Sequence, residues 1–208
     1  MQRAAAALLL LSLLSLLALP ALAGRMPVSC ALGKGPDAVV TLSRDHPIAD
    51  TAVYHLAQGR DARHPLFGGE PDDSRGSGVR VQCAGARQRA MVVQGEFMSA
   101  GYPRGLVVLR EPRTGRFVQL AFAERNAPGW LYLGPKDRLL VFPPGGRIET
   151  RKRYLVYRFA TGQEDAEEVV DTLPDARGYE VIRLQRGQRD EENRSTRKST
   201  KTRVLAAR

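Results

Sequence analysis

The side chains that could support catalysis or metal binding are few and widely spaced. The three histidines, His46, His55 and His64, stand nine residues apart. This spacing matches no metal motif, and the two cysteines have no clustered histidine or carboxylate beside them. No nucleotide-binding glycine motif and no C-x-x-C pair occurs either. We therefore predict no metal site and no cofactor.

A polar stretch at residues 58–78 contains the only outline of a hydrolase. It holds His64, Asp73 and Ser77, one each of the residue types in a catalytic triad. Ser77 lacks the G-x-S-x-G elbow, and serine and aspartate are common in turns. Glu96 has no evident second carboxylate of the kind that sugar hydrolysis requires. A small periplasmic hydrolase using residues 64–78 is thus the alternative to a non-catalytic protein.

A basic, tyrosine-bearing stretch near residue 150 is the leading candidate for binding. On an expected strand, Arg151 and Arg153 point one way, and Lys152, Tyr154 and Arg158 point the other way. Arginine forks bind phosphate and carboxylate groups, so an acidic glycan or lipopolysaccharide fits as a partner. An edge strand whose charges prevent aggregation is the other interpretation. The predicted binding residues are Arg147, Arg151, Lys152, Arg153, Tyr154 and Arg158.

The N-terminal 23 residues have the pattern of a secretory signal peptide. Arg3 precedes an apolar run from Ala4 to Leu19, and Ala21-Leu-Ala23 forms a cleavage site before Gly24. A membrane anchor is the alternative, but the run is shorter than the roughly 20 residues that span a bilayer. We predict a periplasmic or secreted protein with no membrane span after cleavage.

Two cysteines remain in the exported chain, and the simplest expectation is a disulfide between Cys30 and Cys83. Two buried free thiols are the alternative. The chain carries a formal charge of +10, with an excess concentrated at residues 186–208, where eight Lys or Arg accompany three acidic residues. Residues 190–203 have no hydrophobic side chain, so this basic tail is predicted to be disordered. Export and the lack of an aromatic stacking platform argue against nucleic acid as a partner.

Short apolar runs separated by turn residues fill the chain from Gly101 to Phe159, the pattern of an antiparallel β-meander. Residues 27–32, 38–42 and 51–56 predict three earlier strands, and residues 179–184 a last one. Around both cysteines the sequence is similar at a constant offset of 53 residues, which suggests two β-units at 24–78 and 79–160. Chance similarity among common valines and alanines is the alternative.

One helix is predicted near residues 162–173. Thr161 and Glu164 have the spacing of a capping box, and Ala166, Val169 and Val170 fall on one helical face. Residues 24–185 should therefore form a mainly β domain, with an antiparallel sheet closed into a barrel or stacked as a sandwich, and residues 161–185 should supply the helix and the last strand. The predicted function is non-catalytic binding of an envelope partner, either a protein or an anionic polymer.

Overall fold

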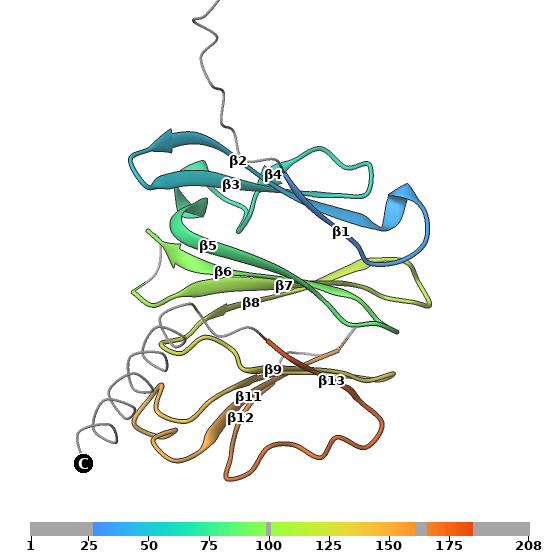
Figure 1. Cartoon of the computed structure of the whole chain (residues 1–208), viewed down its shortest axis with the longest axis vertical. Coiled ribbons are helices and arrows are strands. Elements are labelled where there is room, and N and C mark those ends of the chain that lie inside the picture. The colour runs from blue at the N-terminus through green and yellow to red at the C-terminus, as the bar shows by residue number, and fades with distance from the viewer. Residues whose placement is uncertain (1–26, 99–100, 161–165, 185–208) are drawn as a thin grey trace, which may run out of the picture.

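The computed structural model describes residues 27–98, 101–160 and 166–184, which form two antiparallel sheets and two short 3-10 helices (Figure 1). The predicted signal peptide and the predicted basic tail lie outside these residues. The elements in chain order are β1 (Val28–Ala31), η1 (Pro36–Ala38), β2 (Val39–Ile48), β3 (Thr51–Gln58), β4 (His64–Pro65), η2 (Pro71–Ser74), β5 (Arg75–Ala84), β6 (Ala90–Phe97), β7 (Arg104–Arg110), β8 (Phe117–Ala123), β9 (Trp130–Leu133), β10 (Arg138–Phe142), β11 (Tyr154–Phe159), β12 (Ala166–Val170) and β13 (Glu180–Arg183).

The first sheet has the order β1-β2-β3-β5-β6-β7-β8, with β4 paired to β3. β3 and β5 pair only where Ala52 meets Gly76 and Val53 meets Arg75, so the two strands separate beyond that point. A core cluster then joins β1–β4 to one face of β5–β8; Leu42 and Leu56 contribute from one side and Val93 from the other. Figure 1 shows the result as an upper tier, β1–β4, above a middle tier, β5–β8.

The second sheet, of order β12-β11-β10-β9-β13, forms the lower tier (Figure 1). A second core cluster joins it to the other face of the middle tier, with Val107 from β7 and Leu140 and Phe142 from β10. The two central strands of the middle tier, β6 and β7, are therefore buried on both faces, which explains why they have continuous apolar runs instead of alternating ones. Of the two predicted architectures, the stacked sandwich is the one that the described residues adopt.

The apolar runs predicted between Gly101 and Phe159 form the strands β7 to β11. They do not form one meander, however, because the chain leaves the first sheet after β8 and starts the second sheet at β9. The predicted strand at 179–184 is also confirmed, as β13 at one edge of the second sheet.

The predicted C-terminal helix is wrong where the structure can test it. Thr161 and Glu164 of the predicted capping box lie outside the described residues, but Ala166–Val170 form the strand β12, paired with β11. Val169 packs on the cluster between the sheets and Val170 on the cluster of the outer face, so the two valines face opposite ways. Pairing with an available sheet edge overrides the helical spacing of the apolar residues.

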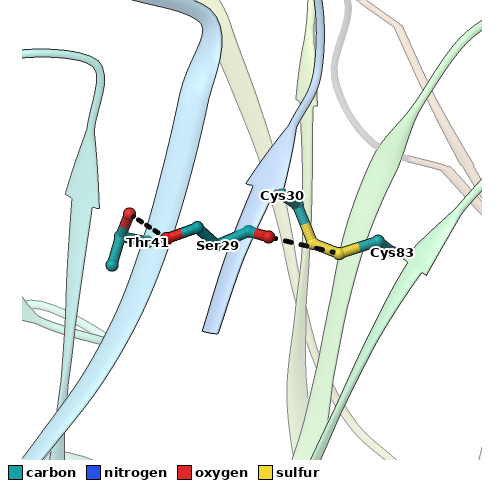
Figure 2. Close-up of a disulfide and its surroundings, with 4 residues drawn as sticks. All are labelled: Ser29, Cys30, Thr41 and Cys83. Carbon is teal, nitrogen blue, oxygen red and sulfur yellow. Dashed lines mark hydrogen bonds between the residues drawn. A yellow bond between two sulfur atoms is a disulfide. The ribbon is translucent and has the colours of Figure 1, made fainter. Parts of the chain in front are cut away.

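The predicted disulfide between Cys30 and Cys83 is present, with the two Cα atoms 5.6 Å apart (Figure 2). It ties the edge strand β1 to β5 and thereby fastens the upper tier to the middle tier. The order β1-β2-β3 is repeated by β5-β6-β7, but Cys30 pairs with Val40 whereas Cys83 pairs with Met91 and not with the equivalent Val93. The internal duplication stays a hypothesis.

Candidate anion-binding surface

The binding residues predicted from sequence lie on β11 and on the loop that precedes it. Their interpretation as an edge strand is wrong, because β11 lies between β10 and β12. The strand begins at Tyr154, so Arg151, Lys152 and Arg153 belong to the loop. The ring of Tyr154 packs edge-on against Trp130, with the ring centroids 5.8 Å apart.

Arg147 is held inside a compact polar cluster. Its Nε donates to Oε2 of Glu124 at 3.0 Å, and its Nη1 donates to Oε1 of Glu167 at 2.6 Å. The Tyr157 hydroxyl donates to Oε1 of Glu124 at 2.5 Å, and Glu124 is only 3% exposed. The hydrogen bonds to Glu124 and then to Glu167 raise the pKa of Arg147, and burial is the main cause of the raised pKa of Tyr157. The charge of Arg147 is thus neutralised within the molecule.

Two more of the predicted arginines are paired in the same way. Arg158 forms ion pairs with Asp137 and, at 3.0 Å, with Glu168. Arg153 pairs with Asp171 at 2.8 Å and donates to the Val169 carbonyl at 3.1 Å. These contacts fasten β11 and its loop to β12 and to the β9–β10 turn.

Only Arg151 and Lys152 of the predicted set are exposed cations that have no ion pair with any described residue. The structure therefore brings the six predicted residues together in one region, but it commits three of the guanidinium groups to neighbouring carboxylates.

A larger group of cations without ion pairs lies in and beside the turns β1–β2, β5–β6, β7–β8 and β9–β10. Each of its members is exposed or half-exposed, and none forms an ion pair with a described residue. We call this group the basic end; it consists of Lys34, Arg87, Arg89, Arg110, Arg113, Arg116 and Lys136.

Strand pairing brings these turns to one end of the molecule. Ala90 pairs with both Ala84 and Leu109, so the β5–β6 and β7–β8 turns are neighbours. A Cβ on Gly85 would lie 3.2 Å from Leu133, which places the start of the β9–β10 turn beside them. The β1–β2 loop joins the group through Gly33, which lies next to the guanidinium group of Arg110.

Arg110 is the half-buried member of the basic end. Its guanidinium lies between two glycines, and an added Cβ would come within 3.5 Å of Nη1 at Gly33 and within 2.8 Å of Nη2 at Gly115. Gly115 has φ +72°, a conformation that favours glycine, so it shapes the turn and leaves room for Arg110. Arg110 has no hydrogen bond or ion pair with a described residue, and its Nε is buried.

The carboxylate of Glu180 fixes the shape of the β5–β6 turn. It accepts hydrogen bonds from the backbone N–H groups of Ala86, Arg87 and Gln88 at 2.6, 3.1 and 3.4 Å. The bond from Ala86 is the largest cause of the lowered pKa of Glu180. β13 is thereby attached to the turn that carries Arg87 and Arg89, across the interface between the two sheets.

Replacing Glu180→Gln should lower the free energy of unfolding at pH 7 by about 1 kcal/mol, because a neutral acceptor binds the three N–H groups more weakly. A lowered pKa in the folded state means that the stabilisation is complete above the ordinary value of 4.5 and is lost as the pH falls through the folded value. Urea unfolding at pH 7 and below pH 4.5 should therefore show that the variant is less stable than the unsubstituted protein, and that this difference in the free energy of unfolding becomes smaller at the lower pH. Glu149→Gln, which changes an exposed acid with no ion pair to a described residue, is the control; an equal loss there would contradict the role of Glu180.

The residues of the hydrolase alternative are not joined by hydrogen bonds. Nδ1 of His64 lies 2.8 Å from the Pro65 carbonyl oxygen, and no hydrogen bond links His64 with Ser77 or Asp73. The hydroxyl that organises this segment belongs to Ser74, which is fully buried and accepts from the Phe67 N–H at 3.1 Å.

His46 and His55 both lie beside Asp45, at 4.0 and 3.3 Å, and Arg63 pairs with the same carboxylate at 3.0 Å. The sequence pattern does not reveal this cluster, because its members come from β2, β3 and the following loop.

Within the described ranges, no three histidine, cysteine or acidic side chains gather as metal ligands. No helix of the described chain has both the length and the apolar character needed to cross a membrane. Comparisons with protein-family models, curated proteins and solved structures found no match.

Proposed function

We propose that the protein is a non-catalytic, exported β-domain that binds an anionic polymer of the cell envelope through its basic end. The observation that carries this proposal is the contrast between two clusters of cations. Arg147, Arg153 and Arg158 are neutralised by carboxylates, whereas the seven cations of the basic end have no ion pair with a described residue.

A repeating anion suits this surface better than a single small one. The cations are spread over the β1–β2, β5–β6, β7–β8 and β9–β10 turns, so they cover a broad area and do not converge on one point. Arginine forks hold phosphate and carboxylate groups with two parallel hydrogen bonds. An acidic glycan or the phosphates of lipopolysaccharide present such groups at intervals. The predicted signal peptide and the disulfide support a location where these polymers occur.

Binding of the purified protein to lipopolysaccharide vesicles, measured across a range of salt concentrations, tests the proposal. Substituting Arg87, Arg89, Arg113 and Arg116 together by Gln should weaken binding about 10-fold or more and should flatten its salt dependence, since exposed charges act through a screened field. Vesicles without lipopolysaccharide are the ligand control.

A double variant, Arg151→Gln/Lys152→Gln, is the matched control for the protein, because it removes the two unpaired cations that sequence analysis had selected. The basic tail is unchanged in both variants, so its contribution to binding cancels. Equal binding by the quadruple variant and the unsubstituted protein would refute the proposal. If only the control variant lost binding, the binding site would instead be the loop before β11.

A further inference from the structure

Strand β8 is one of the two edges of the first sheet and pairs only with β7. The hydrogen bonds from Glu111 N–H to Arg116 and from Glu124 N–H to Pro103 fix which backbone groups face β7. Because these groups alternate along an antiparallel pair, the groups of Val118, Leu120 and Phe122 face β7. The backbone groups that face away from β7 belong to Phe117, Gln119, Ala121 and Ala123, and they have no hydrogen-bond partner among the described residues.

This edge lacks the features that normally prevent strand addition. β8 has the sequence FVQLAFA, with no charge, no proline and no irregularity in its pairing with β7. The other sheet edges are shorter or charged: β1 has four residues, β12 contains Glu167 and Glu168, and β13 contains Glu180 and Arg183. β8 is therefore the one long, uncharged edge among the described strands.

We propose that β8 pairs with β8 of a second copy of this chain, antiparallel and centred on Leu120. In this register the outward-facing residues meet one another, Phe117 opposite Ala123 and Gln119 opposite Ala121, so every outward-facing backbone group gains a partner. The backbone groups on the free side of β8 are thus placed symmetrically about Leu120 and can pair with those of a second copy.

The side chains fit the same register. Val118 falls opposite Phe122 of the second copy, and Leu120 opposite Leu120, on the face that already packs on the lower tier. The opposite face brings together Gln119 and Ala121, whose side chains are exposed in the single chain. The antiparallel arrangement places the two basic ends at opposite ends of the paired strands, so their like charges stay apart.

Light scattering of the purified full chain over a concentration series tests the pairing through the molar mass. We expect twice the mass of one chain at high concentration. Ala121→Pro removes an N–H that faces away from β7, and symmetry counts the loss twice, so the dimer dissociation constant should rise at least about 10-fold. Ala121→Thr keeps the N–H and suits a strand, and it should leave the dimer intact.

A cross-linking variant gives an independent readout. Gln119→Cys/Ala121→Cys places thiols opposite each other across the two-fold axis, at the Cα spacing of about 5.5 Å that a disulfide accepts. We expect a covalent dimer on oxidation, and far less of it from Gln119→Cys alone.

A monomeric full chain at all concentrations, or a dimer that Ala121→Pro leaves unchanged while circular dichroism shows it folded, would overturn the proposal. A monomer that instead captures an extended segment of another protein at β8 would overturn it equally, since the occupant would not be a second copy.

Discussion

Removing the Cys30–Cys83 disulfide should lower the free energy of unfolding by about 4 kcal/mol. The bridge joins residues separated by 53 positions, and without it the unfolded chain regains the conformational entropy that closing this loop removes. The effect should be largest at β1, because this four-residue strand pairs only with β2. Without the bridge, β1 has no covalent tie to the middle tier, and hydrogen exchange should show its amides among the first to lose protection.

Urea unfolding of Cys30→Ala/Cys83→Ala measures the loss. Cys30 is fully buried, so part of the change will come from the missing sulfur in the core. Unsubstituted protein unfolded with and without reductant separates the two contributions, since reduction keeps both sulfur atoms. The double variant should not respond to reductant, and a loss below about 1 kcal/mol on reduction would contradict the bridging role of the disulfide.

Much of the strand content was predictable because its determinants are local. The runs at Leu106–Leu109 and Trp130–Leu133 carry strand-forming side chains and are bounded by glycine and proline turns. The division into two sheets was not predictable, because the step from β8 to β9 looks in sequence like any other turn. Which face a strand buries depends on elements far away in the chain.

The incorrect helix shows the same limit. Ala166, Val169 and Val170 fit one face of a helix, but the paired strand lets Glu167 reach Arg147 and Glu168 reach Arg158. The two arginines lie 20 and 10 residues from their acidic partners, beyond the reach of neighbouring turns of one helix, so contacts with other elements decide the structure of residues 166–170.

The candidate site was harder to predict than the fold. Clustering of cations in sequence selected Arg147 to Arg158, yet the acids that neutralise three of them come from residues as distant as Glu124 and Asp171. The basic end has the opposite character, since its seven cations are divided among four turns, and no turn contributes more than three of them. The order of strands in a predicted meander indicates which turns lie at the same end of the sheet, and this pattern would predict part of the basic end.

A second large effect is expected where the two sheets meet beside the basic end. Nη2 of Arg138 lies 3.4 Å from Oε2 of Glu111, and the two side chains are 2% and 11% exposed. Arg138 begins β10 of the second sheet, while Glu111 directly follows β7 of the first. This pair is thus a buried electrostatic contact between the middle and lower tiers, and it separates Arg138 from the cations available to a ligand.

Arg138→Met should lower the free energy of unfolding by about 3 kcal/mol, because it removes the Arg138 charge from beside the Glu111 carboxylate in a largely buried position. The double variant Arg138→Met/Glu111→Gln should recover much of that loss, since it removes both charges together. Urea unfolding of both single variants and the double variant closes the cycle and isolates the coupling between the two groups.

Lys136→Met, two residues away in the exposed β9–β10 turn, is the matched control and should change stability by less than about 0.5 kcal/mol. Lipopolysaccharide binding should show the reverse pattern. Lys136→Met should weaken binding, whereas Arg138→Met/Glu111→Gln should leave it unchanged. If Arg138→Met were harmless, the pair would not hold the tiers together; if the double variant lost binding, Arg138 would belong to the basic end after all.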